Sequence, residues 1–238
     1  MGKLITLVKS PAALPPGLLA ARWRDQLLPA LVALPGIGSH LVRAVHHHAV
    51  PSGIRAEDGV GGGHWAGVGT YYFDDAALVD RLPTDPAFLA LFARHGEVIE
   101  EAVHLPIDEI LIYDRDTAPL PLKMFAFFKR RPDFTRAQSL HYYRTTHAEV
   151  GEGIVRGRIG RFVQNHVRLD FRSIDPRYDF DAGPEIWFRS MEIALDLFGD
   201  REAMEILSAD EERFVIRSEL INLLTDEQEV FVRADAIA

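Results

Sequence analysis

The sequence predicts an α+β fold in which one order of elements, β-α-β-β-α-β, occurs twice along the chain. The first observation is a repeated strand: "KLITLVK" at 3–9 and "KMFAFFK" at 123–129 are apolar runs bounded by lysines, 120 residues apart. The second is that the same offset places Leu14 opposite Phe134, each at the start of a predicted helix. The third is a chain of 238 residues, 47% of them hydrophobic, which is long enough to bury a sizeable core.

Each copy opens with a strand, a helix and a second strand. In the second copy, Thr135 and Gln138 form the T-x-x-Q pattern of a capping box, which marks the start of the helix. Both helices end in segments that contain glycine, "LPGIGSH" and "RGRIGRF". Second strands are predicted to follow at 41–48 and 162–169.

Each copy closes with a strand, a helical region and a final strand. We predict third strands at 64–73 and 184–195, helical regions at 75–103 and 197–224, and last strands at 107–114 and 226–232. This order is the ferredoxin-like pattern, whose helices cover only one face of the sheet. We therefore predict tandem ferredoxin-like repeats at 1–116 and 121–238, with their sheets facing each other as a pseudo-dimeric barrel.

The composition excludes several classes of protein. A formal net charge of −9, without a long run of either sign, argues against nucleic acid or an anionic membrane as the partner. The absence of cysteine excludes disulfides, thiolate nucleophiles and cysteine-ligated zinc. The N-terminal apolar run is too short for a signal peptide, and no stretch approaches the ~20 apolar residues of a membrane span. We therefore expect a cytoplasmic protein.

One histidine on the helix of the second copy occupies a position that the pattern assigns to the core. Leu140, Tyr143, His147 and Val150 are spaced three, four and three residues apart, so they share one helix face. The offset of 120 residues places Leu27 of the first copy at the position of His147. An ionisable ring there is costly unless it finds a hydrogen-bond partner. His147 is therefore either a neutral core histidine bonded to a backbone carbonyl or a reactive group.

The strand that follows carries polar side chains at alternate positions. Phe162, Gln164 and His166 alternate onto one face, with Val163 and Asn165 on the other. The first of these faces is partly polar, which suits a ligand cavity better than a dry core. It is expected either to line such a cavity or to lie in water at a sheet edge.

Several elements of the second copy resemble the EthD-domain family. They are "KRRPDFTRAQSLHYYRTTHAEV" at 129–150, "RFVQNHV" at 161–167 and "YDFDAGPEIWF" at 178–188. The resemblance covers about 121–233. Residues 1–114 share it only as the first copy of the internal repeat, in which Leu27 replaces the motif histidine. It implies the dimeric α+β barrel superfamily, which holds cyclases, isomerases, dehydratases and monooxygenases without cofactors beside haem enzymes. Carried over, the motif histidine is His147 and the polar strand group is Gln164, Asn165 and His166.

The leading hypothesis is a cofactor-independent acid/base enzyme, a lyase or isomerase, acting on a small hydrophobic carbonyl or phenolic compound. His147 would transfer the proton, because an unperturbed histidine titrates near neutrality. His166, Gln164 or a tyrosine hydroxyl would bind the oxygen that gains charge. The candidate catalytic residues are His147, His166 and Tyr143. The candidate substrate-binding residues are Tyr142, Thr146, Gln164, Asn165, Phe125, Phe127 and Trp187.

Two other classes of function stay open. One is a haem or metal protein with His147, His166 or His104 as an axial ligand. The other is a non-catalytic binding protein of an oxidative pathway.

We expect no metal site: His46 and His48 share a strand face, but a third ligand such as His64 or Asp58 would have to come from the loop, and the spacing matches no known metal motif. The glycine-rich segment 59–64 is expected to be a mobile loop. The apolar third strands make an exposed sheet face improbable. Two repeats could cover each other within a monomer, or each could pair with a second subunit, and we favour a homodimer.

Overall fold

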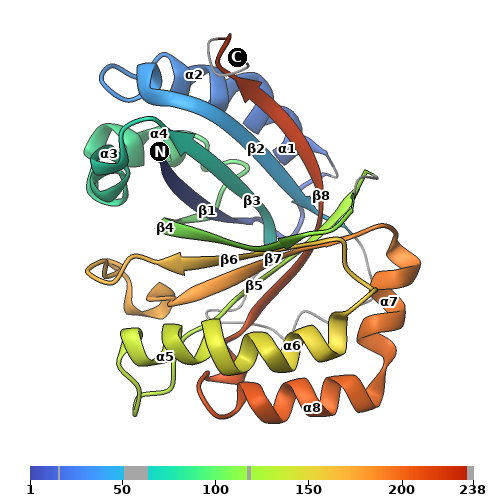
Figure 1. Cartoon of the computed structure of the whole chain (residues 1–238). Helices are drawn as coiled ribbons and strands as arrows, with labels where there is room; N and C mark the ends of the chain where they lie inside the picture. Colours follow the sequence, from blue (N-terminus) through green and yellow to red (C-terminus); the bar gives the residue numbers. More distant parts are fainter. Residues whose placement is uncertain (16, 51–63, 117–118, 235–238) are drawn as a thin grey trace. The chain divides into compact units, whose positions relative to one another are not determined.

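The computed structural model describes residues 1–15, 17–50, 64–116 and 119–234 (Figure 1). Residue contacts divide it into two units. Unit 1 holds the described residues of 1–49, 64–108 and 227–234, and unit 2 holds those of 109–226 together with Val50. The glycine-rich segment 59–63 and the proposed ligand Asp58 lie outside the described residues. No helix within the described ranges has the length and apolar character needed to cross a membrane.

Unit 1 is an antiparallel sheet with helices between its strands. Its strands hydrogen-bond in the order β4-β1-β3-β2-β8, to which β4 and β8 each contribute one part. The strands are β1 (Gly2–Ser10), β2 (Leu41–Ala49), β3 (His64–Phe73), β4 (Glu101–Asp114) and β8 (Ile221–Val232). The helices are α1 (Leu18–Arg22), the π-helix η1 (Trp23–Leu27), α2 (Leu28–Val32), η2 (Gly38–His40), α3 (Ala76–Arg81), η3 (Leu82–Thr84) and α4 (Pro86–Ala93).

Unit 2 has the corresponding order of strands, β8-β5-β7-β6-β4. Its own strands are β5 (Leu122–Phe127), β6 (Arg161–Val167) and β7 (Ala182–Phe188). Its helices are α5 (Arg136–Tyr142), the π-helix η4 (Tyr143–His147), α6 (Ala148–Val155), η5 (Pro176–Tyr178), α7 (Met191–Gly199), α8 (Arg201–Glu211) and η6 (Arg217–Glu219). In Figure 1, α5, α6 and α8 lie on one side of β5, β6 and β7.

The α+β class is confirmed, and several local predictions hold. The capping box forms, with the Thr135 hydroxyl accepting from the backbone of Gln138 and the Gln138 side chain accepting from the backbone of Thr135. The predicted strand 184–195 ends early, because Ser190 caps α7 by accepting from the N–H of Ile193 at 3.3 Å. Both last strands begin earlier than predicted, at Glu101 and Ile221. The description as tandem ferredoxin-like repeats with facing sheets stays a prediction.

Each unit has its own apolar core between sheet and helices. In unit 1, Trp23 and Leu27 of η1 are about 1% exposed and pack in one cluster with Leu4 and Phe88. In unit 2, Tyr143 of η4 packs in a cluster with buried aromatic and aliphatic residues of the sheet and of the segment after α8: Phe128, Leu140, Ala182, Phe214, Val215 and Leu220. Burying a side chain such as Leu27 stabilises a fold by about 1.5–3 kcal/mol. The two π-helices therefore hold equivalent positions, 120 residues apart, in two separate cores.

Candidate functional site

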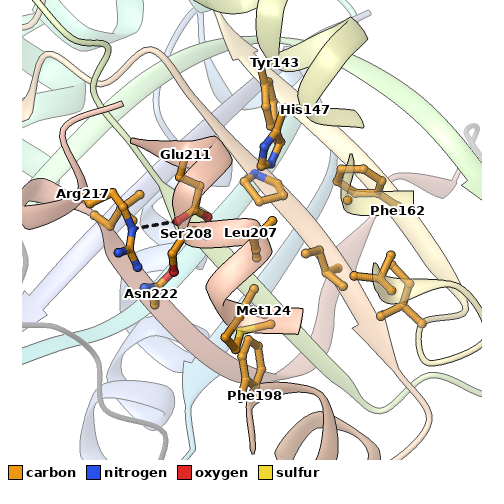
Figure 2. Close-up of a pocket in the computed structure, with 18 of the residues that line it drawn as sticks. Met124, Tyr143, His147, Phe162, Phe198, Leu207, Ser208, Glu211, Arg217 and Asn222 are labelled. Carbon is orange, nitrogen blue, oxygen red and sulfur yellow. Dashed lines mark hydrogen bonds and ion pairs between the residues drawn. The ribbon is translucent and has the colours of Figure 1, made fainter. Parts of the chain in front are cut away.

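Unit 2 contains a largely apolar cavity of about 560 Å³ between its helices and one face of its sheet. A volume of this size is typical of sites for small organic molecules. Figure 2 shows His147 and Tyr143 at the cavity, with Met124 and Phe198 away from them and Phe162 to one side. The cavity is lined by Met124, Ala126, Tyr143, His147, Gly151, Val155, Ile159, Phe162, Pro184, Ile186, Leu195, Phe198, Gly199, Met204, Leu207, Ser208, Glu211, Arg217, Leu220 and Asn222.

His147 reaches the cavity from the last position of the π-helix η4. The Nδ1 atom of His147 lies 2.8 Å from Oδ2 of Asp210, which belongs to α8. The His147 side chain is 14% exposed and the Asp210 side chain 6% exposed. A carboxylate at Nδ1 fixes the orientation and the tautomer of an imidazole, which places the proton on Nδ1 and leaves Nε2 as an acceptor. Nε2 makes no hydrogen bond to any described residue.

The pKa of His147 lies below the ordinary histidine value of 6.5. Burial is the larger cause, because it disfavours the charged imidazolium. Asp210 opposes this effect through its hydrogen bond and its charge, both of which raise the pKa of His147. His147 is therefore neutral at physiological pH and is able to accept a proton.

The two adjacent tyrosines have different surroundings. The Tyr142 hydroxyl donates to Oδ1 of Asp210 at 2.8 Å, so that both oxygens of this carboxylate are occupied. The Tyr143 hydroxyl is buried and has no hydrogen-bond partner among the described residues. Burial first and the charge of Glu211 second raise the pKa of Tyr143 well above 10, so this hydroxyl stays protonated. An unpaired buried donor beside a cavity is suited to a ligand oxygen or an ordered water.

Gln164 and His166 support the helix that carries His147. The side-chain amide of Gln164 donates to the backbone carbonyl of Tyr143 at 3.2 Å, and its oxygen lies 3.0 Å from Nε2 of His166. The His166 ring lies 5.7 Å from the Tyr143 ring, centroid to centroid. Neither residue is among those that line the cavity. These two residues therefore form a layer behind Tyr143.

The other predicted substrate-binding residues lie outside the cavity lining. Phe125, Phe127 and Trp187 belong to the opposite sheet face from Met124, Ala126 and Ile186, which do line it, because side chains alternate along a strand. On that opposite face, Asn165 donates to Glu185 at 3.2 Å and Lys123 pairs with Glu185 at 2.9 Å. Thr146 is exposed on η4. Tyr142 does not line the cavity, and its link to the site is the hydrogen bond that its hydroxyl donates to Asp210.

Five polar residues at or next to the cavity come from the last third of the chain and were not among the predicted site residues. They are Asp210, which holds His147, and the lining residues Ser208, Glu211, Arg217 and Asn222. Glu211 accepts from Nε of Arg217 at 3.0 Å (Figure 2). The stretch "SADEERFVIR" at 208–217 is a polar helix end by its composition, without a motif that separates ligand-facing acids from solvated ones. Only the packing of α8 against α6 assigns these roles.

Two of the histidines of unit 1, His46 and His104, are buried among aromatic rings. His46 stacks on Trp23 with ring centroids 4.5 Å apart, and burial first, then the charge of His48, lowers its pKa to about 3. His104 has its Nδ1 atom 2.9 Å from the Thr6 hydroxyl, and burial lowers its pKa to about 3. Within the described part of the chain, no three histidine or acidic residues are grouped to hold a metal ion. The side chain of His64 lies outside the described residues.

The Asp/Gly-rich segment before β7 has a structural role. Asp181 is fully buried and accepts from Nε of Arg136 at 2.7 Å and from Nη1 of Arg130 at 2.6 Å. Arg136 also donates to Asp179 at 2.9 Å. A Cβ atom at Gly183 would lie 2.7 Å from the ring of Phe127, so glycine is required for this close approach. These contacts fix the start of α5 to the start of β7.

Comparison with protein families identifies this part of the chain. The family model described as the EthD domain matches residues 131–218. The matched residues include His147, Asp210, the contacts of Arg136 with Asp179 and Asp181, and most of the cavity wall. The resemblance predicted from the sequence is confirmed over these residues. A search of curated proteins found no match.

Solved structures with a similar fold include proteins of several activities. An anthrone oxidase-like protein superposes with a TM-score of 0.65 at 8% identity, covering 96% of this chain and 93% of that one. A candidate chlorite dismutase gives a TM-score of 0.49 at 11% identity, covering 97% and 96%. A haem-binding protein from Thermus thermophilus gives 0.46 at 11% identity, covering 100% and 95%. At these identities the likeness concerns the fold.

These comparisons correct the prediction that the protein needs no cofactor. The matched structures include a haem-binding protein and a candidate chlorite dismutase, so the expectation that no cofactor is needed is withdrawn. What the comparisons show is coarser: a mixed α+β fold, and a match to the EthD domain over residues 131–218. A lyase or isomerase in particular is not supported by the proteins that match.

Proposed function

We propose that the protein is an oxidative enzyme whose unit 2 cavity binds a small aromatic compound with a phenol or carbonyl oxygen. The observation that carries the proposal is the pair of His147 and Asp210 at the wall of an apolar cavity of about 560 Å³. A neutral imidazole with an unbonded Nε2 accepts a proton from a phenol or from a carbon beside a carbonyl. The phenolate or enolate that remains is more electron-rich than its parent and gives up electrons more readily to dissolved dioxygen, the oxidant in this proposal.

Each neighbouring group has a role in this proton transfer. Asp210 orients the imidazole and stabilises the imidazolium that forms, as a carboxylate does for the base of a catalytic triad. Tyr142 holds the second oxygen of Asp210 and so keeps that carboxylate in place. The protonated hydroxyl of Tyr143 is available to the ligand oxygen that gains negative charge. Apolar side chains exclude water around the ring system.

Haem is the second candidate occupant, because His147 also has the features of an axial ligand. A ligating histidine commonly donates its other ring N–H to a carboxylate, as Nδ1 of His147 does to Asp210. His104 and His166 are less suitable, since His104 is packed between Phe88 and Phe92, and Nε2 of His166 is bonded to Gln164. Haem supplies one-electron and dioxygen chemistry when bound. In that case His147 would hold the iron and would not act as the base.

Two experiments on the purified full chain separate these candidates. Haem titration, followed by the Soret absorbance, is compared between the wild type and His147→Leu. Oxygen uptake is then measured with anthrone, with a naphthalenediol and with phenol, with and without added haem. We expect His147→Leu to lower oxidation by at least about a hundredfold, the usual contribution of a general base. The matched control is His141→Leu, because His141 is exposed on the same helical segment.

The outcomes are distinct. Loss of oxidation in His147→Leu with no Soret change in either protein supports proton transfer. A Soret band that forms in the wild type and is lost in His147→Leu supports axial ligation. Tight binding of the aromatic compounds without oxygen uptake under any condition would favour a binding protein. Full oxidation by His147→Leu would remove His147 from the mechanism in both candidate functions.

We also propose that the chain consists of two tandem ferredoxin-like repeats, of which the second holds the site. The matching strand orders β4-β1-β3-β2 and β8-β5-β7-β6, and the π-helices 120 residues apart, support this description. The sheet pairing predicted from the sequence, the homodimer and the cytoplasmic location remain predictions. A mass measurement of the native protein tests the homodimer.

A further inference from the structure

Apart from Tyr143 and His147, the polar side chains of the cavity are concentrated on one wall. Figure 2 shows Glu211, Arg217, Ser208 and Asn222 on the same side, while Met124 and Phe198 lie at the apolar end. Ser208 and Glu211 belong to α8, Arg217 to η6 and Asn222 to β8, so several elements contribute to this wall. A ligand with an apolar ring system and an oxygen substituent matches this division. Whether the cavity accepts a charged substituent or only an uncharged one depends on the Glu211–Arg217 pair.

Arg217 is the only lysine or arginine that lines the cavity within the described residues, and it is already paired with acids. Its Nε donates to Glu211 at 3.0 Å, and its Nη1 lies 3.9 Å from Glu212. The side chains of Arg217 and Glu211 are 31% and 20% exposed, so solvent screens this pair only in part. Asp210 precedes Glu211 in α8 and is buried against His147. Arg217 therefore has two acids as partners, and a third acid precedes them in the sequence.

This arrangement disfavours a negatively charged ligand. A ligand carboxylate at Arg217 would lie beside the Glu211 carboxylate that Arg217 already holds, and two like charges repel in a partly desolvated site. An uncharged hydroxyl or carbonyl requires no such exchange, since the Ser208 hydroxyl and the Asn222 amide offer both donors and acceptors. We infer that the Glu211–Arg217 pair makes the cavity selective for uncharged, oxygen-substituted aromatic molecules and excludes their carboxylate analogues.

This inference rests on the proposed function, because it assigns the substrate class of the same cavity. It concerns the aromatic ligand: a haem carries two carboxylates, which would have to lie away from this wall. The distinction matters chemically, because a phenol or ketone keeps the acidic proton that His147 is placed to accept. An arene carboxylate at the same wall would already be an anion.

The test compares two ligands of the same ring size on the full-length protein. Dissociation constants of 2-naphthol, which is uncharged at pH 7, and 2-naphthoate, which is ionised, are measured by calorimetry. We expect the wild type to bind 2-naphthol at least about tenfold more tightly, as expected for one unfavourable charge in a partly buried site. Glu211→Gln should remove the acid paired with Arg217 and tighten 2-naphthoate binding alone, so that the ratio of the two dissociation constants falls about tenfold. Arg217→Gln should raise this ratio.

Glu205→Gln is the matched control, because Glu205 is exposed on the same helix and pairs with Arg201 instead. It should leave the affinity ratio unchanged. Equal binding of both naphthalenes by the wild type, or a ratio that neither variant moves, would overturn the inference while leaving the cavity as a ligand site. If neither compound binds the wild type, the proposed aromatic site falls together with this inference. Arg217→Gln keeps the test decisive if Glu211→Gln does not fold.

Discussion

The hydrogen bond between His147 and Asp210 should be measurable as a coupling free energy of unfolding. The perturbation is a double-mutant cycle of His147→Leu, Asp210→Asn and the two changes combined. Leucine is the natural replacement, since Leu27 fills the matching position of the first π-helix and is 1% exposed. The measurement is made at pH 8, where His147 is neutral because burial lowers its pKa.

The magnitude follows from the burial and the partners of Asp210. A hydrogen bond of 2.8 Å to a buried charged group typically contributes about 1.5–3 kcal/mol. Breaking a fully buried ion pair costs about 3–5 kcal/mol, but Asp210 retains the Tyr142 hydroxyl after the loss of His147. Leucine also restores apolar burial. We therefore expect His147→Leu to destabilise by about 1–2 kcal/mol and the cycle to give a coupling of about 2 kcal/mol.

Urea denaturation followed by fluorescence and by circular dichroism provides the four free energies. His141→Leu is the control for a histidine-to-leucine change on the exposed side of the same helical segment, and it should show no coupling to Asp210→Asn. A coupling below about 0.5 kcal/mol would refute the reasoning, because that value is within the usual error of additivity for groups that do not interact. The orientation of His147 by Asp210 would then have to be abandoned as well.

Three further predictions follow from buried groups. Acid stability should depend on His46: its folded pKa of about 3 lies below the unfolded value of 6.5, so folding free energy is lost as pH falls from about 6.5 towards 3, and His46→Phe should reduce that loss in denaturation series at pH 7 and pH 4. Leu27→His should destabilise by about 2–4 kcal/mol in thermal or urea unfolding, because a buried imidazole would replace apolar burial there without a partner like Asp210; a neutral result would mean that η1 offers a hidden acceptor. Tyr143→Phe should change stability by less than about 1 kcal/mol, since its hydroxyl has no partner among the described residues, yet weaken 2-naphthol binding; a large loss of stability without change in binding would show a structural role instead.

Local signals in the sequence were sufficient for the elements and for the marked histidine. The pair Thr135 and Gln138 predicted the start of α5 because both halves of a capping box lie within four residues. His147 could be selected because the first copy has Leu27 at the same offset. Leucine is sufficient for packing at this helix position, so the fold does not require an ionisable side chain there. The alternation of Phe162, Gln164 and His166 against Val163 and Asn165 also follows from strand geometry alone.

The face of the sheet that borders the cavity could not be obtained in the same way. Because side chains alternate along a strand, Met124 and Phe125 must point to opposite faces of the sheet. Both are apolar, so either face could border a pocket. The choice depends on where the helices pack. Phe125, Phe127 and Trp187 were therefore grouped with His147 in the prediction, whereas Met124, Ala126 and Ile186 share its cavity in the structure.

Asp210 was missed for a related physical reason. It lies 63 residues after His147 and next to two other acids, Glu211 and Glu212, so its sequence context is that of a solvated helix end. Only one of the three meets the imidazole, because helical geometry turns successive residues to different sides. The site therefore combines a residue that a repeat comparison can find with a partner that only tertiary packing reveals.

The paired π-helices show that one backbone form carries a polar pair of side chains in unit 2 and apolar side chains in unit 1. Trp23–Leu27 and Tyr143–His147 have the same irregular helical form at the same offset, although π-helical segments are rare and often lie at functional sites. The irregularity alone therefore does not mark function, since Trp23 in unit 1 donates to Tyr71 at 2.8 Å and packs against the buried core. The two copies differ in their side chains. At the offset of 120 residues, Asp210 corresponds to Ala90 in α4, and His147 corresponds to Leu27. The two polar groups support each other: the imidazole would lose its one hydrogen-bond partner without Asp210, whereas Asp210 without His147 would keep only the Tyr142 hydroxyl.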